Sequence, residues 1–130
     1  MDRASLNNQG FTLIEFLVAV VILMVGMLGL LQAVNVSINS NMQNQLRNEA
    51  LLVADLEMAK ELAKGFDAVS TASKMVYDQR RVLNAFKNFS VARTGAAFQN
   101  SKEIRFQVSW RHHGVRYTHD AGGLISKAQQ

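Results

Sequence analysis

The sequence predicts an α+β fold, in which a long N-terminal helix packs on a small antiparallel β-sheet head. Residues 16–31 form an unbroken apolar run, and apolar residues recur at helical spacing over residues 38–66. Over residues 104–119 apolar and polar residues alternate instead, which is the period of a strand. The helix should therefore have a membrane half followed by an amphipathic half, and the strands should form the head.

The apolar run is long enough to cross a membrane. As a helix, residues 11–31 would span roughly 31 Å at about 1.5 Å per residue, close to the thickness of the hydrocarbon core of a bilayer. Glu15 is the single ionisable residue in this segment. A carboxylate inside a membrane helix is costly and usually marks a function, although Glu15 near the membrane edge could simply reach the lipid headgroups.

The charges around this segment predict its orientation. Arg3 and the amino group of the chain precede the apolar run, and no Lys or Arg follows it until Arg47. Positive charge is retained on the cytosolic side of a membrane. We therefore expect a single-pass inner-membrane protein with its N-terminus inside and its head in the periplasm.

The segment that follows, residues 32–48, is rich in Asn, Gln and Ser, and by composition alone it could be a linker. An apolar stripe with steps of three and four residues indicates a helix instead. The stripe consists of Ile38, Met42, Leu46, Ala50, Val53, Leu56, Ala59, Leu62 and Phe66. Glu61 lies off this stripe, and Gly65 offers a helix stop. We predict one continuous helix from about Phe11 to about Lys64.

The first part of the head is predicted to hold a second, shorter helix over residues 72–87. Its apolar residues at helical spacing are Met75, Val76, Val82, Leu83, Phe86 and Phe89. Residues 94–95 and 99–101 are expected to be turns, because they combine Gly, Thr, Gln, Asn and Ser.

The C-terminal part of the head is predicted to be an antiparallel hairpin. Ile104, Phe106, Val108 and Trp110 alternate with polar residues, which predicts a strand with one buried face. A turn at residues 112–114 would join it to a second strand at residues 115–119, and a third short strand is expected near residues 124–125. The amphipathic half of the long helix would cover the apolar face of this sheet.

The hexapeptide GFTLIE at residues 10–15, followed by the apolar run, resembles the N-terminus of type IV prepilins and their relatives, the class III signal. In that family a membrane peptidase cuts after the Gly and methylates the new N-terminal residue. The resemblance implies a prepilin leader at residues 1–10, cleavage after Gly10 and N-methylation of Phe11. It also implies a transmembrane and assembly helix at 11–31, an amphipathic helix half at 32–65 and a periplasmic globular head at 66–130.

The resemblance gives Glu15 a role in assembly. In the family the fifth mature residue is Glu, and its carboxylate pairs with the amine of a neighbouring subunit's first residue, which means Glu15 and Phe11 here. Such pairing makes physical sense because an unpaired charge in an apolar environment is costly. The implied partners are other pilins and minor pilins through the N-terminal helix, the prepilin peptidase and the pilus assembly platform. The implied location is the inner membrane and then the pilus at the cell surface.

Further features resemble the minor pilins of the type IV pilus modification (PilV-like) family. They are the stretch VGMLGL at residues 25–30, a partial match at residues 48–55, and Val108-Ser109-Trp110 before Gly114. The resemblance implies a minor pilin that co-assembles into a type IV pilus and helps to initiate it. The minor pseudopilins of type II secretion share several of these features and are the alternative.

An alternative of another class is a surface or DNA-binding adhesin subunit. The net charge is +4, and residues 91–130 hold six Lys or Arg against Glu103 and Asp120. A basic face of this kind could meet nucleic acid or an acidic partner, but solvated charges on a sheet face explain it as well. Nucleic acid is therefore not an expected partner.

Nothing in the sequence indicates an enzyme. The chain has no Cys, which excludes thiol catalysis and thiolate metal sites. His112, His113 and His119 have no set of further ligands at a convincing spacing, and the side chains of His112 and His113 should point in opposite directions. There is no phosphate loop, nucleophile elbow or paired-carboxylate motif. We expect no metal, no cofactor and no catalytic residue.

Overall fold

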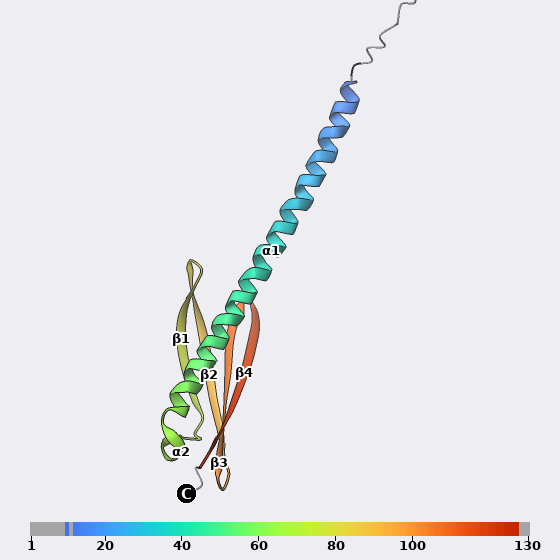
Figure 1. Ribbon diagram of the computed structural model, residues 1–130. Helices are drawn as coiled ribbons and strands as arrows, with labels where there is room; N and C mark the ends of the chain where they lie inside the picture. Colours follow the sequence, from blue (N-terminus) through green and yellow to red (C-terminus); the bar gives the residue numbers. More distant parts are fainter. Residues whose placement is uncertain (1–9, 11, 128–130) are drawn as a thin grey trace, which may run out of the picture. The chain divides into compact units, whose positions relative to one another are not determined.

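The computed structural model describes Gly10 and residues 12–127. Along the chain its elements are α1 (Leu13–Leu62), α2 (Gly65–Ala68), β1 (Lys74–Val82), β2 (Ala85–Ala97), β3 (Ser101–His112) and β4 (Val115–Ser126) (Figure 1). The predicted α+β class is confirmed by the long helix and the four antiparallel strands. The chain divides into two compact units between Ser40 and Asn41, within α1.

The long helix α1 is continuous through the segment that resembled a linker. It begins at Leu13, ends at Leu62 and includes all of residues 32–48. Gly65, three residues after its end, has a φ of +77°, a conformation that glycine adopts without steric cost. The prediction of one helix from about Phe11 to Lys64 is therefore confirmed to within two residues at each end.

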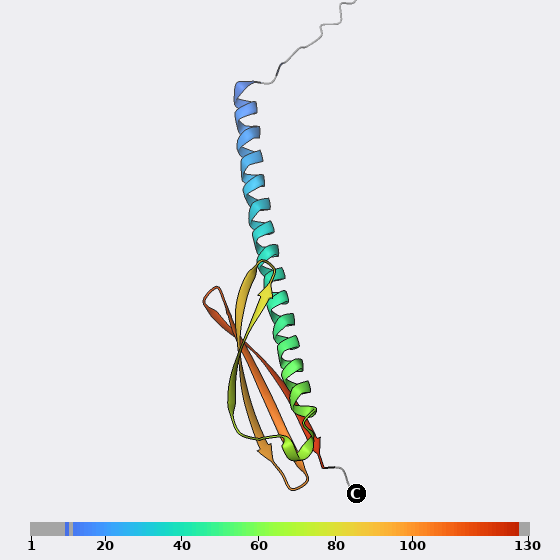
Figure 2. The ribbon, with the colours of Figure 1, turned by 90° about the vertical axis from the view of Figure 1, so that its left-hand side faces the viewer.

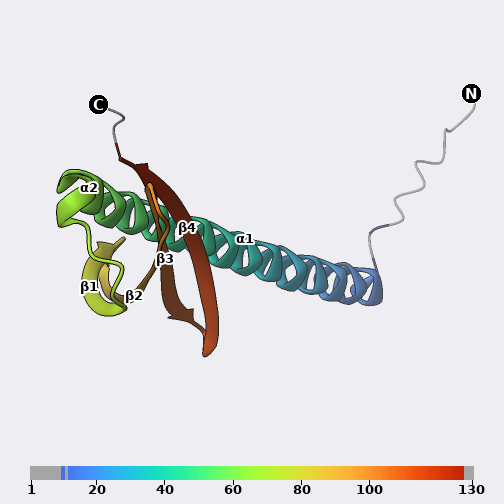
Figure 3. The ribbon, with the colours of Figure 1, turned by 90° about the horizontal axis from the view of Figure 1, so that it is seen from below.

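The sheet is a simple meander in the order β1-β2-β3-β4, and every neighbouring pair is antiparallel. Figure 3 shows the four strands side by side in this order. In the central pair Ser90 lies opposite Ser109, and in the next pair Trp110 lies opposite Tyr117. The predicted hairpin of residues 104–119 is confirmed, with a turn at His113 and Gly114. These two residues have φ values of 47° and 79°, as the tightest hairpin turns require.

The core lies between the sheet and the part of α1 that belongs to the second unit, which runs along one face of the strands (Figures 1 and 2). α1 contributes Leu46, Ala50, Val53 and Ala54; β1 and the segment before it contribute Val82 and Val69; β2 and β3 contribute Phe89, Val91, Ile104, Phe106, Val108 and Trp110. The alternation predicted for β3 is confirmed, because every second residue from Ile104 to Trp110 is buried. The Trp110 ring stacks on Tyr117 at a centroid distance of 5.9 Å.

The buried stripe of α1 follows the prediction as far as Val53 and then departs from it. Leu56 and Leu62 are 42% and 47% exposed, whereas Ala54 and Glu61 are buried. A helix turns by about 100° per residue, so each step of three falls about 60° short of a full turn. Three such steps in a row after Val53 move the predicted stripe to the opposite side of the helix. Glu61, predicted to lie off the stripe, faces the sheet.

The predicted helix over residues 72–87 is wrong, because these residues form β1 and the start of β2. The two strands pair from Lys74 opposite Arg93 to Val82 opposite Ala85. Pairing with a strand that is itself buried in the core overrides a weak helical pattern. Of the apolar residues that suggested the helix, Val82 is buried, whereas Met75 and Phe86 are exposed.

Two smaller predictions in the head are also wrong. Residues 94–95 are not a turn, because β2 continues to Ala97, which pairs with Lys102 of β3. The chain reverses at residues 98–100, which overlaps the other predicted turn. Residues 124–125 do not form a separate strand, because they are the end of β4.

Gly95 permits the segment after α2 to pass close to β2. A Cβ atom at this position would lie 2.8 Å from Cα of Thr71, and real Cβ atoms do not come that close to a backbone. A Cβ at Gly122 in β4 would meet nothing nearer than Cγ of Arg105 at 3.7 Å, which is an ordinary contact. The two glycines therefore form a matched pair on β2 and β4, the strands on either side of β3.

We predict that Gly95→Ala lowers the free energy of unfolding of the head by about 1–3 kcal/mol, as overpacking of a tight contact does. Thermal unfolding of the full chain in detergent micelles, followed by the fluorescence of its single Trp, measures this change. For a domain of this size each kcal/mol lowers the midpoint by about 4–8 °C. Gly122→Ala is the control and should leave the midpoint within about 2 °C of the parent. Equal midpoints for the two variants would refute the role given to Gly95.

A buried ion pair joins α1 to β2. Nη1 of Arg93 donates to Oε1 of Glu61 at 2.6 Å, and both side chains are less than a tenth exposed. Lys64 donates to the same carboxylate oxygen at 2.8 Å, and Nη2 of Arg93 donates to the carbonyl of Ala72 at 2.9 Å. The pair therefore holds the end of α1, the centre of the sheet and the segment before β1 together. This ion pair was not predicted, because the helical stripe in the sequence leaves Glu61 on the solvent side.

The environment of Glu61 makes the stability of the head depend on pH. Burial alone raises the pKa of the carboxyl, but hydrogen bonds and charge from Lys64 and Arg93 outweigh it, and the pKa lies below its ordinary value of 4.5. Because the pKa is lowered in the folded state, this contribution to stability is present above pH 4.5. It is lost as the pH falls through the folded-state pKa.

We predict that Arg93→Met lowers the free energy of unfolding at pH 7 by about 3 kcal/mol, because it leaves a buried carboxylate with Lys64 as its remaining partner. The double variant Glu61→Leu/Arg93→Met should recover much of this loss. Arg80→Met is the control: the Arg80–Asp78 pair is about a third exposed on both sides, and such pairs contribute about 0–1 kcal/mol. The penalty of Arg93→Met should shrink below pH 4.5. A penalty that is independent of pH would contradict the ion-pair explanation.

Candidate functional site at the start of the long helix

The residues around the first turn of α1 form the candidate site. Gly10 is exposed and lies outside any helix or strand, and Thr12 is the last residue before the helix begins at Leu13. Phe11, which the prediction also includes, lies outside the described residues, as do residues 1–9. The described part of the site is therefore Gly10, Thr12 and Glu15.

Thr12 and Glu15 bind each other in a reciprocal capping arrangement. The backbone N–H of Thr12 donates to Oε2 of Glu15 at 2.9 Å, and the N–H of Glu15 donates to the Thr12 hydroxyl at 3.3 Å. The hydroxyl in turn donates to Oε2 at 3.1 Å. This is a capping box, in which the cap residue and the third helical residue satisfy each other's free backbone donors. The capping box was not predicted, although Thr-x-x-Glu before an apolar run is its sequence signature.

The capping box fixes two properties of the site. It makes Leu13 the first helical residue, so that Gly10 remains outside the helix. It also places a carboxylate at the helix N-terminus, where the free N–H groups and the helix dipole favour negative charge. Within the described residues, Glu15 accepts hydrogen bonds through Oε2 only. Its second carboxylate oxygen, Oε1, is therefore open to a further cation or donor.

The apolar surface that follows is exposed all round the helix. Most of its large apolar side chains are more than half exposed, from Leu13 at 80% to Leu31 at 64%. The most apolar window of 18 residues has a mean hydropathy of 2.7, and none of it is buried. A core helix of a water-soluble protein can reach the same hydropathy, but it is mostly buried. Among the described residues this is the one helix long and apolar enough to cross a membrane.

The histidines of the head come closer together than predicted. The rings of His112 and His113 are 4.1 Å apart and meet edge to face, although adjacent residues near a strand were expected to point in opposite directions. The left-handed backbone of His113, with φ of 47°, brings the two rings together. No third His, Cys, Asp or Glu joins them in the part of the chain that the structure describes. Burial lowers the pKa of His112, with a smaller effect from His113.

Comparison with known protein families gives one match. The family described as "Prokaryotic N-terminal methylation motif" matches residues 5–31, which include Gly10, Phe11, Glu15 and the whole apolar run of residues 16–31. Comparison with curated proteins and with solved structures gives no significant match. The motif is typical of structural rather than catalytic proteins, and with the apolar helix it fits a single-pass membrane anchor. The chain thus carries a prokaryotic N-terminal methylation motif, which supports a type IV pilin-like or pseudopilin-like protein.

Proposed function

We propose that this protein is a minor pilin, a structural subunit that co-assembles into a type IV pilus and helps to initiate its assembly. The methylation motif, matched over residues 5–31 and continued by a helix whose apolar surface is exposed, is the observation that carries the proposal. In this function the subunit waits in the inner membrane with its N-terminus in the cytosol and its head in the periplasm. It then enters a filament at the cell surface, where other helices cover its apolar surface.

Processing comes first in this proposal. Prepilin peptidase cuts after Gly10 and methylates the amine of Phe11. A peptidase needs an extended substrate backbone at the bond that it cuts, and the capping box supports this because it starts the helix only at Leu13. Gly10 is exposed and outside the helix, which keeps it accessible to the enzyme.

Assembly then depends on Glu15. After cleavage, the Phe11 amine of a neighbouring subunit carries a positive charge into the apolar interior of the filament, and the carboxylate of Glu15 neutralises it. An unpaired charge in such an environment would be costly. The contacts of Glu15 support this role, because Thr12 uses one carboxylate oxygen and leaves the other available. The partners of the helix are other pilins and minor pilins, together with the pilus assembly platform.

The pilus is favoured over a secretion system by the stretch VGMLGL at residues 25–30, which resembles the PilV-like minor pilins. A minor pseudopilin of type II secretion is the alternative, because its N-terminus has the same signal and helix. The two functions predict different defects when assembly fails: the host loses pili if the protein is a minor pilin, and it loses secretion if the protein is a pseudopilin.

We predict that Gly10→Leu blocks removal of the leader, because a bulky side chain replaces the small one at the cut. Mass spectrometry of the protein from membranes of its own host measures this, because loss of the leader and addition of the methyl group each change the mass. Gly26→Leu is the matched control: a Cβ at Gly26 meets nothing within 4 Å, and this residue lies far along the helix from the cut. A mature, methylated Gly10→Leu protein would refute the processing step.

We predict that Glu15→Val is inserted in the membrane and processed but does not assemble. Glu15→Gln separates the two roles of this residue, because Gln preserves a capping box but not the charge. If the charge is required, both variants should fail to assemble; if only the cap matters, Glu15→Gln should assemble normally.

The readouts, in the host, are the amount of sheared surface pili and the amount of secreted enzymes. Loss of pili with normal secretion supports the minor pilin, and loss of secretion with normal pili supports the pseudopilin. Normal incorporation of Glu15→Val into filaments would refute the pairing role of Glu15.

A further inference from the structure

The face of the sheet that points away from α1 holds an open groove. No described helix of the second unit covers this face, because the core and the part of α1 that belongs to this unit lie on the other one. The groove has a volume of about 660 Å³ and crosses all four strands, from Tyr77 on β1 to Arg116 on β4. Ser90 and Ser109 form its floor, with their hydroxyl oxygens 2.6 Å apart.

Apolar side chains line one side of the groove. Tyr77 is 76% exposed, Phe86 is 68% exposed and Met75 is 52% exposed. These residues share one face of the neighbouring strands β1 and β2: Tyr77 lies opposite Ser90, Met75 opposite Ala92, and Phe86 further along β2, opposite Arg81. Burial in the core of the head cannot explain them, because the core is on the opposite face. Large rings gathered on a surface are typical of a binding site.

Two guanidinium groups line the other side. Arg111 of β3 and Arg116 of β4 lie directly opposite each other in the ladder. Like charges in this position destabilise a sheet, so the pair opposes folding unless an anion binds it. No carboxylate lines the groove, and neither Arg takes part in an ion pair with the described residues. Arg116 donates to the hydroxyl of Ser109 at 3.2 Å, which orients it over the floor.

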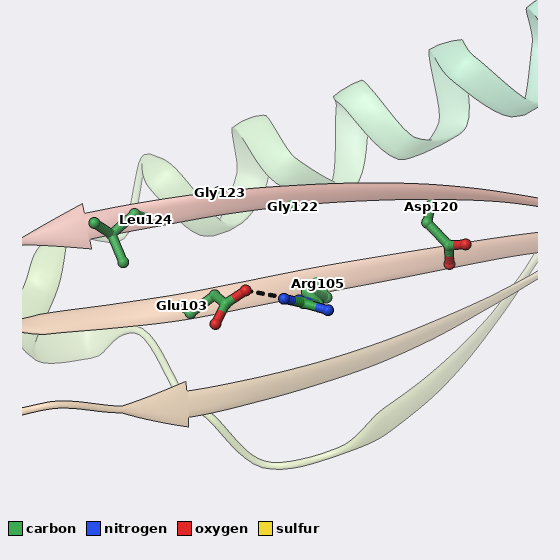
Figure 4. Close-up of a pocket in the computed structure, with 6 residues that line it drawn as sticks. All are labelled: Glu103, Arg105, Asp120, Gly122, Gly123 and Leu124. Carbon is green, nitrogen blue, oxygen red and sulfur yellow. Dashed lines mark hydrogen bonds and ion pairs between the residues drawn. The ribbon is translucent and has the colours of Figure 1, made fainter.

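A second hollow on the same face provides a contrast. It is lined by Glu103, Arg105, Asp120, Gly122, Gly123 and Leu124 (Figure 4). Its cation is already neutralised, because Nε of Arg105 donates to Oε1 of Glu103 at 2.6 Å. It has two carboxylates and no aromatic ring. A basic and aromatic character is therefore a property of the first groove and not of the whole face.

We propose that the groove binds single-stranded nucleic acid. Unpaired bases stack on the rings of Tyr77 and Phe86, and backbone phosphates bind Arg111 and Arg116. Exposed rings beside cations are the arrangement by which proteins bind single strands without reading their sequence. A duplex keeps its base faces stacked inside and cannot use the rings. An acidic protein segment would satisfy the guanidinium groups but not the rings. The proposal goes beyond the role in a pilus and does not depend on filament assembly.

The test is a titration of a fluorescently labelled oligodeoxythymidylate with the full chain in detergent micelles, followed by anisotropy. Each phosphate that a cation neutralises contributes a slope of about −0.7 to the plot of log affinity against log salt for single strands. Lys87 also lines the groove, so three cations predict a slope of about −2.1, and Arg111→Gln should reduce it to about −1.4. Tyr77→Ala and Phe86→Ala should each weaken binding roughly tenfold with the slope unchanged, because stacking releases no counterions.

The neighbouring hollow provides matched controls. Arg105→Gln removes the same charge on the same face, and Leu124→Ala truncates a side chain that is 62% exposed. Both should leave affinity and slope at the parent values. Arg111→Gln removes one of two opposed like charges and should keep or raise the unfolding midpoint, and the other variants should keep the parent midpoint, since the changed side chains lie outside the core.

Four results would overturn the proposal. The first two are no binding of oligodeoxythymidylate at all, and an unchanged affinity in both ring variants. The third is an equal loss of affinity for Arg105→Gln and Arg111→Gln. The fourth is that unlabelled duplex or polyglutamate displaces the labelled oligonucleotide as well as the unlabelled single strand does. The last result would assign the groove to general anion attraction or to an acidic protein partner. Preference for the single strand, with separate effects of charge and ring variants, would establish the site.

Discussion

The apolar surface of α1 between Leu13 and Leu31 is the constraint on which the rest of the protein depends. Its side chains have no partner in the described chain and are exposed on every side of the helix. At about 25 cal/mol for each Å² of apolar surface, leaving a helix of this kind in water is strongly unfavourable. The surface must be covered by another apolar environment; in the proposed function lipid covers it in the membrane and other such helices cover it in the filament.

The same constraint explains why the helix changes character along its length. A helix in lipid needs no polar face, whereas a helix that covers one side of a sheet needs one apolar stripe and a polar remainder. α1 has both patterns without a break, and the residues between them, rich in Asn and Ser, remain helical. Glu61 and Arg93 then fix the end of the second pattern to the sheet through a buried ion pair. Removing one partner of such a pair costs more than the pair contributes, so the two residues depend on each other.

Much of this could be predicted from the sequence, because several patterns are local. The apolar run, the strand alternation from Ile104 to Trp110 and the N-terminal methylation motif each lie within one segment; the helix, the strand and the motif match were all found. The β1–β2 hairpin could not be predicted in this way. Met75 and Val82, seven residues apart, recur at a spacing that a helix also allows, and only pairing with the buried strand β2 decides between the two. Glu61 was missed for a related reason: its partner is 32 positions along the chain.

The candidate site was predicted only in part, and the missing part changes how Glu15 is understood. Its role in pairing with an amine follows from the resemblance and remains a proposal. The capping box with Thr12 is a property of this chain, and it gives Glu15 a structural role before any partner arrives. The two roles are compatible, because a carboxylate has two oxygens and the box uses one. A residue that caps its own helix and also binds a neighbour's amine would hold that amine at the start of the helix, where the helix dipole favours the carboxylate. In the proposed assembly the charge of Glu15 would then be held in place by its own chain before subunits pair, which would reduce the entropy lost on pairing.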